Sequence, residues 1–325
     1  MAARFDYRPP FWLPGGNAQT IWAALHARRF DGEPPRFERE RWATPDGDFI
    51  DVDHLQGPAA APRRLVLFHG LEGSSASQYA QAFAAVARGR GWGFSVPHFR
   101  GCSGELNRGP RAYHSGDFEE IGWILQRLRA AGPQPLLAVG ISLGGNALLR
   151  WAQEAGDTAA ATTAAVAAVC SPIDLASAGR AIDRGFNRLV YARMFLSTMI
   201  PKALQKWRQH PGLFDRERVA AARTIFAFDD AFTAPLHGFA GTADYWARAS
   251  AAPHLGRLRV PALVLNAGND PFVPAHELPG PQQAGRFVSF WRPAGGGHVG
   301  FPHGGFPGRV KQMPAAVAGW LAAHA

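Results

Sequence analysis

The stretch at residues 135–150, PLLAVGISLGGNALLR, joins an apolar run, a glycine-rich turn and helix-forming residues. This succession predicts a buried strand, a tight turn and a helix. In the G-x-S-x-G pattern, Gly140 and Gly144 let the strand and the helix pass without Cβ clashes. Ser142 is therefore expected at the tip of a strained turn, with its Oγ pushed outward as a nucleophile. The N–H of Leu143, first in the helix, is expected to bind a developing oxyanion.

The composition suits a globular enzyme better than a nucleic-acid-binding protein. A chain of 325 residues, 47% of them hydrophobic, can bury the core of one large α/β domain or two small ones. The net charge of +9 invites a nucleic-acid partner. The arginines are scattered, however, and the lysines are confined to Lys202, Lys206 and Lys311. We therefore expect no nucleic-acid binding.

Cysteine usage and the N-terminal sequence bear on the compartment. Cys102 and Cys170 are the two cysteines, which suits free thiols in a reducing environment. Charged residues and prolines interrupt positions 4–10, where a signal peptide would need an apolar core. No segment approaches 18 consecutive apolar residues, so no transmembrane segment is predicted. A cytoplasmic location is the expectation.

Short apolar strands alternate with helical patterns along most of the chain, which predicts a mostly parallel twisted sheet with helices on both faces. A hairpin is expected at 36–54, because Pro45-Asp46-Gly47-Asp48 separates two strand-like runs. The alternation lapses between residues 175 and 257, where a helical lid insertion is expected. Residues 1–35 are aromatic and broken by prolines, which suggests an arm on the surface. We expect one domain, 1–325.

A serine nucleophile needs a base and an acid that orients the base, and one candidate for each follows the last two predicted strands. Asp270 comes directly after the apolar run 260–266, and His298 lies in a glycine-rich loop after the run 287–291. The carboxyl ends of parallel strands meet at one edge of a sheet, where Ser142 should also emerge. His298 is therefore the predicted base and Asp270 the predicted acid that orients it.

Other acidic residues and histidines are alternatives for these roles. Asp174 closes the strand after the nucleophile and is the second choice of acid. Asp229 and Asp230 lie within the insertion and are interpreted as helix-capping residues. His303 lies beyond the loop at the strand end, and His69 is expected to bond the backbone of its own loop. That loop, His69-Gly70-Leu71-Glu72-Gly73, should supply a second oxyanion donor, the N–H of Leu71. No metal or cofactor is called for.

The chain resembles the α/β-hydrolase superfamily and, within it, the YheT-like branch (AB hydrolase 4 family). The resemblance covers nearly the whole chain. It rests on 17–20 (NAQT), 69–74 (HGLEGS), 99–104 (FRGCSG), 140–146 (GISLGGN) and a signature running from Asp229 to Asp270. Trp246 departs from the aromatic of tyrosine type that is commoner there. The resemblance implies hydrolysis of carboxylic esters, with eukaryotic relatives acting on acylglycerols or phospholipids.

The expected function is that of a serine hydrolase that cleaves carboxylic esters through an acyl-Ser142 intermediate. Two alternatives remain: an acyltransferase that uses the same residues, and a binding protein that has the fold without catalysis. In the stretch 188–202, Phe195 and Met199 are candidates to line a pocket for medium-chain or lipid-like acyl groups. The same stretch could instead rest on an anionic membrane as a peripheral contact, or simply pack on the core. Oligomeric state and substrate are left open.

Overall fold

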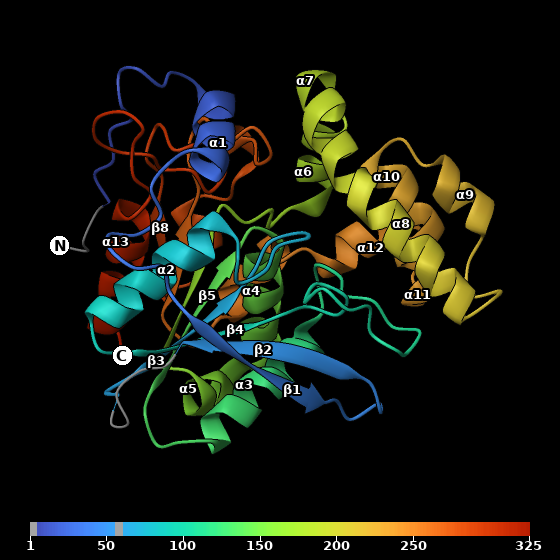
Figure 1. The fold of residues 1–325 in the computed structure, drawn as a ribbon, viewed down its shortest axis with the longest axis horizontal. Coiled ribbons are helices and arrows are strands. Elements are labelled where there is room, and N and C mark those ends of the chain that lie inside the picture. The colour runs from blue at the N-terminus through green and yellow to red at the C-terminus, as the bar shows by residue number, and fades with distance from the viewer. Residues whose placement is uncertain (1–4, 56–60) are drawn as a thin grey trace.

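The fold is built on one eight-stranded sheet, seen in a computed structural model that describes residues 5–55 and 61–325 (Figure 1). The strand order is β1-β2-β4-β3-β5-β6-β7-β8. The strands are β1 (Phe37–Ala43), β2 (Phe49–Leu55), β3 (Arg64–Phe68), β4 (Gly93–Pro97), β5 (Leu136–Ile141), β6 (Ala165–Val169), β7 (Ala262–Leu265) and β8 (Val288–Trp291).

The expected hairpin at 36–54 is confirmed as the β1–β2 pair. These two strands are antiparallel, and β2 is also antiparallel to β4. All pairs from β4 to β8 are parallel. The mostly parallel sheet predicted from the alternation of strands and helices is therefore present, and the carboxyl ends of β3, β5, β6, β7 and β8 lie along the same edge.

Helices cover both faces of this sheet. Side chains of β3 alternate between them: Leu65 and Leu67 pack in the core on one face, whereas Val66 and Phe68 belong to the core on the other. The first core is closed by α2 (Gln78–Gly89) and α13 (Gln312–Ala323). The second is closed by α3 (Phe118–Ala130) and α4 (Leu143–Ala155), with the short α5 (Ala159–Thr162) beyond them.

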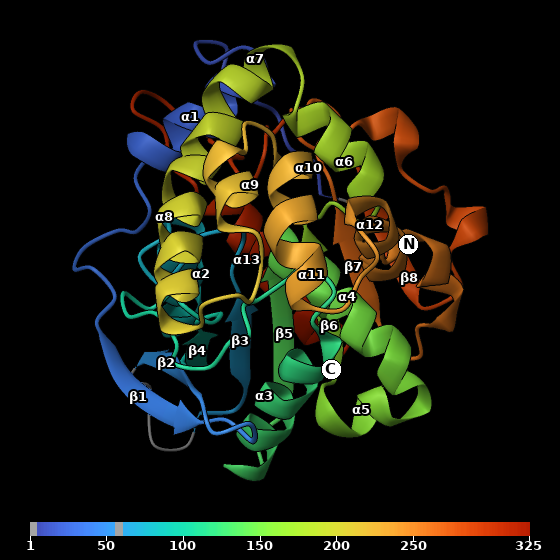
Figure 2. The same cartoon turned by 90° about the vertical axis from the view of Figure 1, so that its right-hand side faces the viewer.

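The segment between β6 and β7 is helical, as expected, and forms a layer of its own (Figure 2). Its helices are α6 (Leu175–Ile182), α7 (Gly185–Asn187), α8 (Arg193–Gln209), α9 (Arg216–Ala221), α10 (Ile225–Phe228), α11 (Ala234–Leu236) and α12 (Thr242–Ala249). A π-helical turn, Arg188–Ala192, makes α7 and α8 one continuous helical stretch. The helices share a separate apolar core that includes Leu196, Phe228 and Trp246. We call residues 175–257 the insertion.

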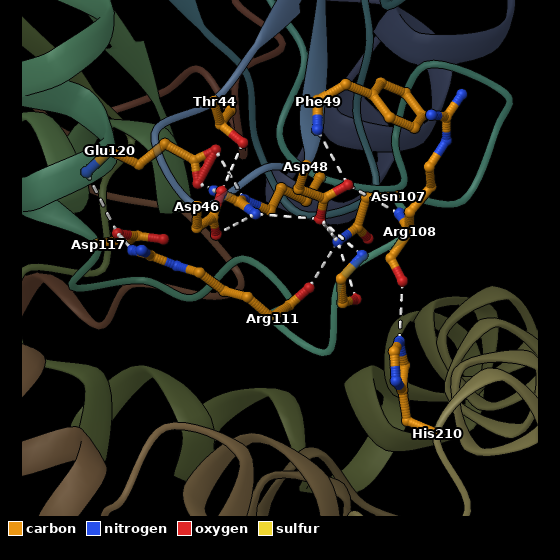
Figure 3. Close-up of polar contacts among 12 residues, drawn as sticks. Thr44, Asp46, Asp48, Phe49, Asn107, Arg108, Arg111, Asp117, Glu120 and His210 are labelled. Carbon is orange, nitrogen blue, oxygen red and sulfur yellow. Dashed lines mark hydrogen bonds and ion pairs between the residues drawn. The ribbon is translucent and has the colours of Figure 1, made fainter.

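A buried network of charges holds the loop between the sheet and the insertion, and Figure 3 shows it together with the bond from His210 of the insertion to the Arg108 carbonyl. The Arg100 guanidinium pairs with Asp46, Asp48 and Glu120. Asp48 also accepts hydrogen bonds from the Asn107 side chain and from the N–H groups of Arg108 and Gly109, so it holds the loop at 105–111. From α8, the Lys206 ammonium donates to the carbonyls of Asn107 and Gly109, at 2.6 Å each. The loop is thus fixed from both sides.

The first residues described are more than the surface arm expected from their prolines. They contain a helix, α1 (Gly16–Leu25), in which Gln19 and Ala23 are fully buried. An ideal Cβ on Gly16 would lie 1.8 Å from the carbonyl oxygen of Asn269, so α1 begins in backbone contact with the loop after β7. This close approach requires glycine at that position.

Candidate active site

Ser142 lies at a strained turn between β5 and α4, as its motif predicts. Its φ of 52° and ψ of −119° lie in a region that residues other than glycine seldom adopt. An ideal Cβ on Gly140 or on Gly144 would come within 2.4 Å of backbone oxygen atoms. The two glycines of the pattern are therefore steric requirements of the turn, which exposes the serine at the carboxyl end of the sheet.

His298 and Asp270 meet Ser142 at this edge. The Oγ of Ser142 lies 2.9 Å from Nε2 of His298, and Nδ1 of the same ring lies 3.0 Å from Oδ2 of Asp270. Because a carboxylate can only accept, Nδ1 carries the proton and Nε2 is left to accept from the serine hydroxyl. The Asp270 side chain is fully buried, whereas that of His298 is 11% exposed. This arrangement places a base beside a nucleophile and a fixed charge behind the base.

The Asp270 carboxylate is itself held in place. Its Oδ1 accepts from the backbone N–H groups of Phe272 and Val273, in the turn that follows it. The Phe272 ring packs against the imidazole of His298, with 4.3 Å between ring centroids. The acid and the base are thus oriented by the loop after β7.

The loop after β3 lies next to the serine. An ideal Cβ on Gly70 would lie 3.3 Å from Cβ of Ser142. The N–H of Gly70 donates to the hydroxyl of Tyr79. Within the described residues, no hydrogen-bond acceptor is found for the N–H of Leu71 or of Leu143, and both residues line the same pocket as Ser142. Two free donors beside a nucleophile fit an oxyanion hole.

His69 shapes this loop, as expected from its sequence. Its Nε2 accepts from the N–H of Phe99, so Nδ1 carries the proton and donates to the carbonyl of Gly70. Burial lowers the pKa of His69 to about 3, which keeps the ring neutral. It therefore has no free nitrogen for proton transfer.

The other candidates from the sequence are engaged elsewhere. The Asp174 carboxylate caps α6 by accepting from the N–H of Ser177. The backbone of His303 bridges to Arg309. Asp230 lies inside a π-helical turn, Asp229–Thr233, and so does not cap the segment that follows it; its carboxylate accepts instead from the N–H of Thr242 at the start of α12.

The expectation that Asp229 caps a helix is wrong. Its carboxylate accepts from the Thr233 hydroxyl at 2.7 Å and from the indole N–H of Trp246 at 2.9 Å. Burial raises the pKa of Asp229 to about 6. Asp229 also lines the pocket above Ser142. An Asp-Asp pair before a helical segment has the pattern of a cap, and only the packing of α12 reveals the burial.

An apolar pocket leads from Ser142 into the insertion. It holds about 1090 Å³ of space free of protein atoms, its open mouth included. Phe195 and Met199 of α8 line it, as the sequence suggested. Further apolar walls come from Leu71, Leu143, Ile182, Ile225, Phe228, Phe232, Trp246 and Phe272. Aromatic and aliphatic walls with few polar groups suit an apolar ligand part.

Helix α1 supports the histidine loop, a role that the sequence did not reveal. The Thr20 hydroxyl oxygen accepts from the backbone N–H of His298 at 2.8 Å. The Gln19 side-chain oxygen accepts from the N–H of Gly296 and from the side chain of Asn269. The Asn269 side-chain oxygen in turn accepts from the N–H of Gly297. The sequence indicates the NAQT segment only through a resemblance, since contacts between residues 250 to 278 positions apart leave no local pattern.

Cys170 lies close to the pair formed by Asp270 and His298, and the possible metal-ligating atoms of the three residues lie within 4.8 Å of one another. Burial raises the pKa of the Cys170 thiol well above its usual value, so it stays protonated. Its sulfur accepts from the N–H of Val299. A metal would need a thiolate and would have to separate the acid from the base. The donor set therefore fits proton transfer better than metal binding.

Comparison with known proteins identifies the family of the chain. Residues 63–304 match the family model described as the alpha/beta hydrolase fold. The chain is 38% identical over 313 residues to the protein named "Putative esterase YheT" of Escherichia coli, covering 95% of this chain and 90% of that one. It is 27% identical over 325 residues to human "Phospholipase ABHD3", covering 94% of this chain and 76% of the relative.

Solved structures share the fold at low sequence identity. A Pyrococcus furiosus esterase, Pf2001, superposes with a TM-score of 0.54 at 13% identity, covering 89% of this chain and 90% of the other. A thermophilic esterase from Thermogutta terrifontis superposes with a TM-score of 0.51 at 19% identity, covering 89% of this chain and 100% of the other. Together with the family match and the relatives, these likenesses lead to one conclusion: the chain belongs to the α/β-hydrolase family, in its YheT-like branch.

Proposed function

We propose that this hydrolase cleaves carboxylic esters by acyl transfer through Ser142. The observation that carries the proposal is the 2.9 Å contact between Oγ of Ser142 and Nε2 of His298 at a strained turn, with buried Asp270 behind the ring. A nucleophile, a base and an orienting acid in this order are what ester cleavage by a serine requires.

The geometry suggests the following steps. The Ser142 oxygen attacks the ester carbonyl while Nε2 of His298 takes its proton, and Asp270 stabilises the imidazolium. The N–H groups of Leu71 and Leu143 bind the oxyanion. The imidazolium then protonates the departing alcohol, which leaves an acyl-Ser142 ester. A water molecule, deprotonated by the same nitrogen, releases the acid and restores the serine.

The pocket supports the substrate class. We infer that the insertion acts as a lid whose apolar walls hold a medium-chain acyl group, with Phe195 and Met199 contacting the chain. The relatives named as an esterase and as a phospholipase are compatible with such a substrate. An acyltransferase would use the same groups with an alcohol in place of water, so the acceptor has to be tested directly.

The test is labelling with a fluorophosphonate followed by turnover of p-nitrophenyl esters. Ser142→Ala should lose both labelling and turnover, with at most a residual ~10³-fold acceleration over water. Ser115→Ala is the matched control, because Ser115 lines the same pocket but its hydroxyl accepts from the Asn146 amide and bonds no histidine among the described residues. It should be labelled like the wild type. Ester turnover unchanged in Ser142→Ala would refute the mechanism.

The same assay separates the alternatives. Release of free acid in water alone supports hydrolysis, whereas product that forms only with an added alcohol indicates an acyltransferase. A wild-type protein that neither labels nor turns over any ester would favour a binding protein with this fold.

A further inference from the structure

The outer face of the α7–α8 helical stretch is unusually apolar for a surface. Phe186 is 50% exposed, Leu189 is 72% exposed and Met194 is 52% exposed. The opposite side of the stretch is packed inward, with Tyr191, Ala192 and Leu196 buried. The helix is thus apolar on both sides, although its inward side alone meets the needs of the core. The outer side chains leave apolar area in water that folding does not bury.

Three arginines surround these side chains, and they are unpaired. Arg184, Arg188 and Arg193 are all exposed. The ion pairs of the insertion's basic residues run instead from Lys202, Arg218, Arg248 and Arg257. Within the part of the chain that the structure describes, no carboxylate pairs with the three arginines. The Asp183 carboxylate accepts from the N–H groups of Ile225 and Phe226, and it interacts with the Arg188 guanidinium only at a distance longer than an ion pair.

The position of this face relates it to the pocket. Phe195 and Met199, on the same helix, line the pocket above Ser142. On its other flank, the Tyr191 hydroxyl donates to the side chain of Asn17 in α1. Figures 1 and 2 agree in placing α1 and α7 at one end of the molecule, opposite α3. The face therefore lies at one end of the protein, on the helical stretch that also lines the apolar pocket.

We propose that this face docks on the surface of an anionic lipid bilayer. We define it by Arg184, Phe186, Arg188, Leu189, Arg193 and Met194, and call it the α7–α8 face. Its apolar side chains enter the boundary between headgroups and acyl chains, and its guanidinium groups bind lipid phosphates. Unpaired cations around an apolar centre are complementary to that boundary and to no neutral surface. Among the described residues, no helix has both the length and the apolar character that a membrane span requires.

The charge pattern distinguishes this occupant from a second copy of the chain. A face with three unpaired arginines would meet the same three arginines across a two-fold axis, and like charges would repel. An anionic bilayer offers many phosphates at once, each arginine adding a similar increment to binding. The docking is independent of the proposed hydrolysis, because binding can be measured without turnover.

The experiment is co-sedimentation of the full chain with vesicles of phosphatidylcholine alone and of phosphatidylcholine with ~30% phosphatidylglycerol. We expect the wild type to partition at least ~10-fold more strongly to the anionic vesicles, and less at high salt. The double variant Arg188→Glu/Arg193→Glu should lose at least ~10-fold of that binding. Leu189→Asp should weaken it as well, because an apolar anchor is lost.

Arg129→Glu is the matched control, since Arg129 is exposed on α3 at the far end of the molecule. It should bind within about twofold of the wild type. Thermal unfolding of each variant checks that the fold is intact, as expected for exposed positions outside the pocket. Equal partition to both vesicle types, or equal losses in Arg129→Glu and the double variant, would overturn the proposal. So would dimers in sedimentation equilibrium that Leu189→Asp dissociates, since a second copy would then cover the face.

Discussion

At the scale of single residues, the assignment of the acid is the most direct point to test. Asp270→Asn removes the charge behind His298 and should lower kcat/KM by ~10²- to 10⁴-fold, because the imidazolium loses its partner. His298→Ala should be about as damaging as Ser142→Ala. Asp174→Asn is the control, since asparagine also caps helices, and its kcat/KM should stay within about twofold. A larger loss in Asp174→Asn than in Asp270→Asn would move the acid to the loop after β6.

Asp229 predicts a pH dependence of stability. Burial raises its pKa in the folded state to about 6, from 3.8 in the unfolded chain. Between about pH 4 and pH 6 the folded state therefore holds the proton more tightly, and the free energy of unfolding falls as pH rises. Above pH 6 the carboxylate is ionised in both states, and burying its charge lowers the free energy of unfolding by at most ~3 kcal/mol, at about 1.4 kcal/mol per pKa unit. Below pH 4 the carboxylate is neutral in both states and this loss is absent.

Asp229→Asn should remove that slope, because an amide stays neutral and can still accept from Trp246 and donate to Thr233. The measurement is urea unfolding of both proteins at pH 4.5 and at pH 7.5. The variant should gain stability relative to the wild type at the higher pH. A constant difference between the two proteins across this range would show that Asp229 titrates normally.

Sequence patterns identified the catalytic candidates but not the environment of Asp229. Ser142, Asp270 and His298 each follow a strand, so the edge at which parallel strands end was enough to bring them together. The burial of Asp229 depends on Trp246, which lies 17 positions along the chain on another helix. No local pattern records that contact.

At the scale of elements, α1 is predicted to position the base. Thr20→Val removes the acceptor of the His298 N–H, which leaves the loop free to shift the imidazole. We expect kcat to fall by about tenfold with little change in KM, and Thr20→Ser to restore it. Thr198→Val is the control, because its hydroxyl only donates to a carbonyl of its own helix. Equal kcat in Thr20→Val and Thr20→Ser would deny α1 this role.

The insertion is predicted to set the preference for acyl length. Phe195→Ala and Met199→Ala each enlarge the apolar pocket and should shift the relative kcat/KM of short and medium esters by ~1 to 3 kcal/mol. The measurement covers acetyl through octanoyl esters. Met194→Ala is the matched control, since Met194 lies on the same helix, is half exposed and does not line the pocket. An unchanged profile at unchanged stability would exclude α8 from the acyl site.

Elements differ in how well the sequence foretold them. Strands, the hairpin and the helical insertion follow from periodicity and turn residues, which are local properties. The helix in the N-terminal segment was missed, because prolines and glycines surround Gly16–Leu25 and the helix has no side-chain cap. Its stability comes from backbone contact with the loops after β7 and β8, which only the fold brings together.

At the scale of the whole molecule, the buried network around Lys206 should govern how firmly the insertion is attached. Lys206→Met removes the ammonium donor from the carbonyls of Asn107 and Gly109 and leaves Gly109 only a 3.4 Å bond from the Asn107 side chain. This loss should cost ~2 to 4 kcal/mol of unfolding free energy. Lys202→Met is the matched control. The Lys202 ammonium is 37% exposed and pairs with Glu72, so its loss should cost about 1 kcal/mol or less. Denaturant unfolding measures both, and equal costs would contradict the role given to Lys206.

The bonds from α1 to the histidine loop also have a consequence for biosynthesis. Thr20 and His298 are 278 positions apart, yet the hydroxyl of one fixes the backbone of the other. Ribosomes deliver the chain from its N-terminus, so α1 waits for its partners until almost all of the protein has emerged. Contacts between residues so far apart in the chain also form slowly, because closing a long loop costs conformational entropy. A nascent or truncated chain can thus form the turn that carries Ser142 before His298 is oriented. We therefore expect catalysis only after the C-terminal part of the chain has folded.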